Sequence, residues 1–147
     1  MRADHDSRPM PHRPNDAHGH LVRGPSGRVW VAGDTGLHPE MAALPDLAGG
    51  PLDLALVPVW GWGPRLSPGH LTPDQAAIAV ARSGARFAIP VHWGTLHPPF
   101  ALRFARDWLD LPGRHFAEAL RQHAPDCEPV VLEPGESCVL PAAAGAA

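Results

Sequence analysis

Four residues of this 147-residue chain are candidate metal ligands, and two of them, Asp34 and His92, follow expected strands; the four are His5, Asp34, His70 and His92. Imidazole nitrogens and carboxylate oxygens are the ligands that zinc takes in catalytic sites, where one position stays open for water. The two oxygens of a carboxylate can also join two metal ions at the spacing of about 3.5–4 Å that two-metal hydrolases use. These residue types therefore favour a hydrolytic metal centre. A single histidine after a strand is more often a structural residue, so this interpretation depends on all four together.

The elements expected around these residues bring two of them to the same edge of a sheet. Asp34 lies in the turn GDTG, directly after an expected strand at 28–32, and His92 follows the expected strand "RFAIPVH" at 86–92. The carboxyl ends of strands in α/β proteins are where ligands usually bind. We therefore expect Asp34 and His92 to lie close together.

The remaining segments alternate between strand and helix patterns. The turn GPSG joins strands at 21–23 and 28–32 into a hairpin, and "LDLALVPVW" at 52–60 predicts a buried strand. Thr72, Pro73 and Gln75 form a capping-box start for a helix that Gly84 ends. Further helices are expected at 38–48, 100–109 and 114–123, and a closing hairpin at 129–140. The order β-β-α-β-α-β-α-α-β-β predicts an α/β domain.

The composition excludes several classes of function. Hydrophobic residues make up 44% of the chain and charged residues 18%, which is typical of one globular domain. The net charge of −3, without a basic stripe, argues against nucleic-acid binding. We find neither a membrane-span pattern nor a signal-peptide pattern. Two cysteines without metal-ligand spacing predict a reduced, cytoplasmic protein.

Six sequence pieces, in order, carry a resemblance to a known family. They are ADH at 3–5, the strand ending in GDTG, D-x-A-x-x-P at 53–58, H-x-x-P-x-x-A at 70–76, HWGT at 92–95 and GES at 135–137. The chain resembles the C-terminal half of a metallo-β-lactamase-fold hydrolase. Within that superfamily it is most similar to the branch that contains N-acyl-phosphatidylethanolamine phospholipase D and the ascorbate-phosphate lactonases.

This resemblance implies roles for the metal-binding candidates. His5 would be an imidazole ligand of the first zinc, Asp34 the carboxylate that bridges both zinc ions, and His92 a ligand of the second. His70 would be a catalytic residue near the metals, in contact with the substrate or its leaving group. The reaction would be hydrolysis of a phosphodiester, a lactone or a similar ester by metal-bound hydroxide.

The same resemblance suggests a substrate loop. Trp60, Trp62 and Arg65 lie where relatives contact a small-molecule or lipid substrate. A packed lid over the sheet edge is the alternative for the two tryptophans. His18 and His20 look like a two-ligand motif, but the Asp-His that should follow is absent, so we expect them to lie outside the site.

The chain also departs from the family pattern. The motif H-x-H-x-D-H, which supplies four metal ligands in the superfamily, is absent from the 147 residues. We therefore expect residues 1–140 to form the C-terminal half of an αββα sandwich without its N-terminal half, followed by a disordered tail at 141–147. Such a truncated chain would bind zinc partially or not at all and would be inactive by itself. The alternative is a non-catalytic half-domain that acts as a binding or assembly module, as a homodimer or with a separate N-terminal half.

Overall fold

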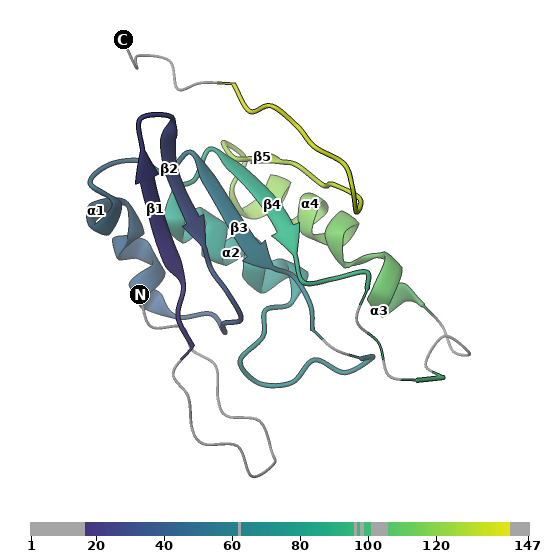
Figure 1. The fold of residues 1–147 in the computed structure, drawn as a ribbon. Coiled ribbons are helices and arrows are strands. Elements are labelled where there is room, and N and C mark those ends of the chain that lie inside the picture. Colours follow the sequence, from purple (N-terminus) through teal and green to yellow (C-terminus); the bar gives the residue numbers. More distant parts are fainter. Residues whose placement is uncertain (1–16, 62, 96, 98, 101–105, 142–147) are drawn as a thin grey trace.

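The computed structural model describes residues 17–61, 63–95, 97, 99–100 and 106–141, and these form one layer of strands backed by one layer of helices (Figure 1). The five strands belong to one sheet in the order β1-β2-β3-β4-β5. Their bounds are β1 (His20–Gly24), β2 (Gly27–Val31), β3 (Leu54–Pro58), β4 (Phe87–Val91) and β5 (Glu128–Pro129). The β1–β2 pair is antiparallel, as the GPSG turn predicts, and the other three pairs are parallel. The carboxyl ends of β2, β3 and β4 therefore meet at one edge of the sheet.

The helices occupy the connections between the parallel strands and the segment before β5. They are the 3-10 helix η1 (Pro39–Ala43), α1 (Leu44–Ala48), α2 (Pro73–Ser83), α3 (Asp107–Asp110) and α4 (Pro112–His123). The predicted capping box of α2 is confirmed: the Gln75 amide N–H donates to Thr72 Oγ1, and the Thr72 N–H donates to Gln75 Oε1. Gly84 ends that helix in the left-handed conformation, as predicted.

Two expectations near the carboxyl end of the chain were wrong. The predicted hairpin at 129–140 is reduced to β5, and residues 130–140 contain no further strand. Pro129 and Pro134 remove backbone donors from that segment, and Val139 is 96% exposed. The helix expected at 114–123 begins two residues earlier, because Pro112 stands at the first position of α4, where its missing N–H costs nothing.

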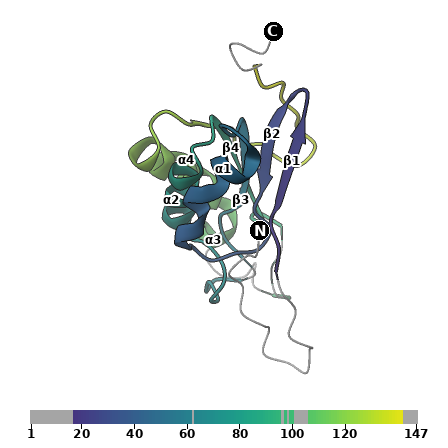
Figure 2. The same ribbon diagram turned by 90° about the vertical axis from the view of Figure 1, so that its left-hand side faces the viewer.

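The helices cover only one face of the sheet. Trp30, Ala55 and Ala88 are neighbours across β2, β3 and β4, and all three are fully buried on the face that the helices cover. Figure 2 shows the helices gathered on that side of the strands. In the described part of the chain no helix covers the opposite face, although its residues are apolar: Val29, Val31, Leu54, Leu56, Ile89 and Val91 are half-buried there, and Val22 is 55% exposed.

The predicted α/β class with a single half-sandwich layer is thus what the structure has. The predicted domain limit at 140 and the tail at 141–147 fall mostly outside the described residues and stay predictions. None of the described helices is long and apolar enough to cross a membrane.

Candidate metal centre

Asp34 stands at the carboxyl edge of the sheet because β2 ends in a tight turn. The Ala32 N–H still donates to the Leu56 carbonyl oxygen at 2.9 Å, and the chain then turns at Gly33, whose φ is +66°. A Cβ at Gly33 would lie 3.0 Å from the backbone oxygen of His18. Glycine is suited to this position for two reasons: it adopts the left-handed backbone conformation without strain, and it has no Cβ to clash with the neighbouring chain. The GDTG turn consequently presents the Asp34 carboxylate at the sheet edge, with 35% of the side chain exposed.

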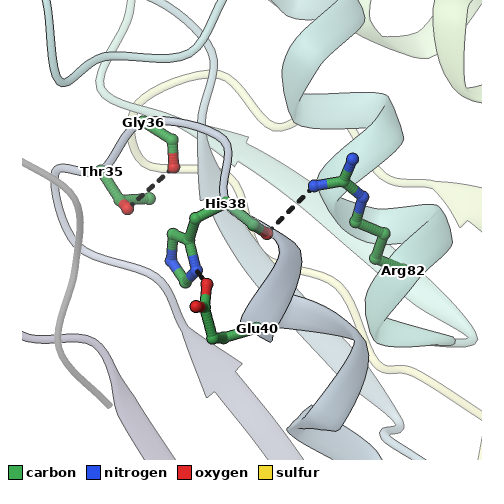
Figure 3. Close-up of polar contacts among 5 residues, drawn as sticks. All are labelled: Thr35, Gly36, His38, Glu40 and Arg82. Carbon is green, nitrogen blue, oxygen red and sulfur yellow. Dashed lines mark hydrogen bonds and ion pairs between the residues drawn. The ribbon is translucent and has the colours of Figure 1, made fainter.

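The segment after Asp34 is tied down by polar contacts (Figure 3). Thr35 is buried, and its hydroxyl donates to the Gly36 carbonyl oxygen at 3.0 Å. The Arg82 guanidinium, on α2, donates to the His38 carbonyl oxygen at 3.0 Å, and His38 Nδ1 donates to Glu40 Oε2 at 3.1 Å. A backbone hydrogen bond and, next, the His38 ring hold the pKa of Glu40 below its usual value. The loop that carries Asp34 is therefore anchored to α2.

His92 approaches Asp34 from the carboxyl end of β4, which β3 separates from β2 in the sheet. Its Nε2 lies 3.2 Å from Asp34 Oδ1, and its side chain is 20% exposed. The hydrogen bond to Asp34 raises the pKa of His92, and partial burial opposes that rise. The expectation that strand order brings Asp34 and His92 together is confirmed by this geometry.

His70 reaches the same place from the loop between β3 and α2. Its Nδ1 lies 3.1 Å from Ser67 Oγ and 3.4 Å from the Pro68 carbonyl oxygen. Its ring meets the His92 ring edge to face, with centroids 5.7 Å apart at 83°. A Cβ at Gly61 would lie 3.0 Å from His70 Cδ2, so glycine at that position leaves room for the imidazole.

Asp34, His70 and His92 form a group that could hold a metal ion. Each offers one ligand atom, and the three atoms lie within 4.8 Å of one another. Two nitrogens and one carboxylate oxygen are the ligand set of a catalytic zinc site, which leaves a fourth position for water. The partial exposure of all three side chains leaves the site open to solvent. The donor set and the spacing therefore fit one divalent ion.

The other predicted site residues divide into two groups. His5 and Trp62 lie outside the described residues. Trp60 is half-buried, and its indole N–H donates to the Gly63 carbonyl oxygen at 2.9 Å, which closes a short turn. Arg65 is exposed in the same loop. The structure thus gives Trp60 a role in shaping the loop, whereas a contact of Trp60 or Arg65 with substrate stays a prediction.

Sequence reasoning missed two residues that hold His70. Ser67 bonds its imidazole, and Gly61 makes room for it. Their signal was weak, because serine and glycine are common in any loop that is rich in glycine and proline. His18 and His20, both exposed, are not members of the three-residue group, as the sequence predicted.

Comparison with known families gives one match that covers most of the chain. The model of the β-lactamase superfamily domain matches residues 1–93. A UPF0173 metal-dependent hydrolase of Nitratidesulfovibrio vulgaris is 37% identical over 123 residues, which are 83% of this chain and 44% of that protein. A UPF0173 metal-dependent hydrolase of Methanopyrus kandleri is 34% identical over 119 residues, which are 81% of this chain and again 44% of the relative. The chain therefore spans less than half the length of these relatives.

Solved structures with the same fold show the same partial coverage. The metallo hydrolase Igni18 of Ignicoccus hospitalis aligns with a TM-score of 0.61 at 23% identity, over 91% of this chain and 48% of that one. The metallo-β-lactamase fold protein YhfI of Bacillus subtilis aligns with a TM-score of 0.59 at 14% identity, over 92% of this chain and 46% of that one. Both likenesses concern the fold alone. They agree with the predicted half-sandwich.

Proposed function

Because this chain belongs to the β-lactamase superfamily domain family, in the metallo-β-lactamase fold, we propose that it contributes part of the metal centre of a metal-dependent hydrolase. The observation that carries this proposal is the convergence of Asp34, His70 and His92 from three separate loops onto ligand atoms within 4.8 Å of one another. Three loops that meet in this way at the carboxyl edge of a parallel sheet are typical of a binding site.

We propose zinc as the metal, with two ions in the complete centre. In this proposal Asp34 and His92 would hold the metal, Asp34 would serve both ions, and His5 would supply an imidazole to the other ion. When bound, zinc supplies a Lewis acid that polarises the scissile carbonyl or phosphoryl group and lowers the pKa of water. The chemistry of the three described donors supports this choice, since imidazole and carboxylate suit zinc.

His70 moves a proton in the proposed reaction. The contacts of its Nδ1 with Ser67 and the Pro68 carbonyl oxygen favour the tautomer in which Nδ1 carries the proton and Nε2 carries the lone pair. Nε2 can then take up a proton and deliver it to the leaving oxygen of the substrate. Its edge-to-face contact with His92 keeps this atom beside the metal ligands.

The proposed substrate is a small molecule or a lipid that carries a phosphodiester, a lactone or a similar ester. Trp60, Trp62 and Arg65, in the loop that leads to His70, are the proposed contacts. Arg65 is exposed and offers a cation to an acidic group, and an indole offers an apolar surface. Membership of the branch that contains N-acyl-phosphatidylethanolamine phospholipase D and the ascorbate-phosphate lactonases is part of this proposal.

The 147-residue chain is proposed to be inactive by itself. Only two of the proposed ligands, Asp34 and His92, lie in the described residues, and the H-x-H-x-D-H motif is absent from the sequence. Metal affinity depends on the number of ligands and on their fixed geometry. The expected behaviour is therefore weak zinc binding without turnover.

An assembly function is the second candidate, and the sheet face that none of the described helices covers favours it. That face carries a continuous row of half-buried valine, leucine and isoleucine side chains. An apolar patch of this kind usually marks an interface. Because this chain spans 44% of its relatives' length, the proposed occupant is a polypeptide equivalent to the part that it does not span. A second copy of this chain is the competing occupant.

Turnover and mass measurements separate these candidates. Purified chain is incubated with zinc and either bis-p-nitrophenyl phosphate or a γ-lactone, with Asp34→Asn as the control, and its mass is measured by light scattering. Zinc binding that Asp34→Asn abolishes supports the metal-centre proposal. Robust zinc-dependent turnover by the wild-type chain alone would refute its proposed inactivity. An obligate dimer without zinc binding would favour the assembly function and overturn the hydrolase proposal.

A further inference from the structure

His92 has a backbone conformation that needs outside support. Its φ is +62°, in the left-handed region, where residues with a Cβ are rare. Among the described residues other than glycine, only Phe100 shares this feature. The strain sits at the point where β4 ends and the His92 side chain turns toward Asp34. Strained conformations of this kind persist only when the surrounding structure holds them.

The side chain of Trp93 reaches back past His92, the residue with the strained backbone, and bonds the chain before it. Its indole Nε1 donates to the carbonyl oxygen of Pro90 at 3.1 Å. Pro90 and Trp93 flank the segment that contains His92, so this bond closes a ring of chain around it. The indole also packs against the hydrophobic core while remaining partly exposed. Trp93 therefore connects the turn at His92 to the rigid part of the protein.

Gly113 provides the space that the indole occupies. A Cβ at Gly113 would lie 2.4 Å from Trp93 Cζ2, 2.7 Å from Cε2 and 2.8 Å from Cη2. Gly113 lies in the first turn of α4, where a glycine costs stability relative to alanine. Its φ does not call for glycine, so the reason for glycine here is the aromatic ring that packs on its backbone.

We propose that Trp93 is a positioning residue for the metal centre: seated on Gly113 and bonded to Pro90, it holds the left-handed turn that directs His92 Nε2 toward Asp34. The inference rests on the proposed metal site for its functional consequence. Its structural part, that the seat of the indole fixes His92, can be tested without any metal.

Two pairs of variants test the positioning role. Gly113→Ala forces the indole out of its seat, and Gly24→Ala is its control, because a Cβ at Gly24 would meet nothing within 4 Å. Trp93→Phe removes the N–H donor and shortens the ring, and Trp108→Phe, at a half-buried position in α3, is its control. Residues that support a metal ligand typically change metal affinity about 10- to 100-fold when they are mutated.

The first readout is zinc affinity measured by calorimetry. Gly113→Ala and Trp93→Phe should each weaken zinc binding about tenfold or more, while both controls stay within about twofold of wild type. The melting temperature without zinc is measured for all four, because a merely structural role would lower it and leave the affinity unchanged. Unchanged affinity in both test variants would overturn the proposal.

The second readout is the conformation of His92 in zinc-free crystals or by NMR. The proposal expects the His92 φ to leave the left-handed region, or its contact with Asp34 to be lost, in Gly113→Ala. If His92 keeps its left-handed φ and its contact with Asp34 in this variant, the positioning proposal is overturned. This outcome can be read even if wild type binds no zinc and the metal-centre proposal fails. If Gly113→Ala does not fold, the same comparison is made with Trp93→Phe.

Discussion

Asp53 provides a quantitative test of how the sheet is held together. It lies directly before β3, at the edge of the sheet opposite the metal centre. Its Oδ2 accepts the Arg28 backbone N–H at 2.8 Å, and its Oδ1 lies 3.3 Å from Arg86 Nη1. A Cβ at Gly27 would lie 2.7 Å from Asp53 Oδ2, so the hairpin leaves room for this carboxylate. One side chain thus joins β2, β3 and the start of β4.

The cost of Asp53→Ala follows from these contacts. A hydrogen bond to a charged group contributes about 1.5–3 kcal/mol. The Arg86 pair contributes about 0–1 kcal/mol, because its side chains are 38% and 22% exposed and solvent screens the attraction. The expected loss is therefore about 1.5–4 kcal/mol in the free energy of unfolding. At about 3 °C per kcal/mol for a chain of this size, the melting temperature should fall by roughly 5–12 °C.

Thermal unfolding followed by circular dichroism, together with zinc calorimetry, measures the effect. Asp126→Ala, in an exposed turn, is the matched control and should shift the melting temperature by less than about 2 °C, as surface substitutions do. Zinc affinity of Asp53→Ala should stay within about twofold of wild type, since β3 separates Asp53 from the site by about 16 Å. A melting temperature equal to that of Asp126→Ala would refute this reasoning. A loss of zinc affinity in an Asp53→Ala variant of unchanged stability would show that Asp53 belongs to the metal site and does not stabilise the sheet.

Three further predictions rest on separate parts of the molecule. Zinc affinity should fall as the pH drops through the raised pKa of His92, which lies above 6.5, because zinc needs the neutral imidazole. Without zinc, protonated His92 stabilises the fold below pH 6.5, and this stabilisation is lost as the pH rises through the raised pKa. Calorimetry and thermal unfolding over a pH series check the two directions. Burial raises the pKa of the Cys127 thiol to about 12. A thiol reagent should therefore react rapidly with exposed Cys138 and with Cys127 only after unfolding. Rapid reaction of both cysteines in the folded protein would contradict this expectation. Thr72→Ala should lower the free energy of unfolding by about 1 kcal/mol, because the helix loses its cap. Gln75→Ala keeps the Thr72 hydroxyl as acceptor and should lower it by less. Equal stability of wild type and Thr72→Ala in urea would argue against the capping box.

Local sequence signals predicted most of the elements near the site. The GPSG turn, the capping box at Thr72 and the two apolar runs before His92 and after Pro51 each depend on residues close together in the chain. The meeting of Asp34 with His92 also followed from the sequence, because the parallel strands β2, β3 and β4 end at the same edge of the sheet. The resemblance to the metallo-β-lactamase fold is supported by the family match, while its branch stays a prediction.

The features that the sequence did not reveal depend on contacts between distant segments. Gly113 looks like a helix breaker next to Pro112, and only the Trp93 indole that packs on it explains a glycine inside α4. The apolar alternation at 129–140 predicted a hairpin, but β5 pairs with β4 alone. Sequence pattern reports which residues favour a strand and does not report whether an edge is available to pair with it.

Zinc binding to the purified 147-residue chain decides whether Asp34 and His92 hold a metal ion. Isothermal calorimetry at pH 7.5 is performed on wild type, Asp34→Asn and His92→Ala, with His115→Ala as a control at an exposed histidine in α4. We predict that wild type and His115→Ala bind zinc with the same weak affinity, and that Asp34→Asn and His92→Ala lose that binding. Equal zinc affinity in all four proteins would contradict the proposed metal centre, because the ion would then be held by residues other than those that converge at the edge of the sheet.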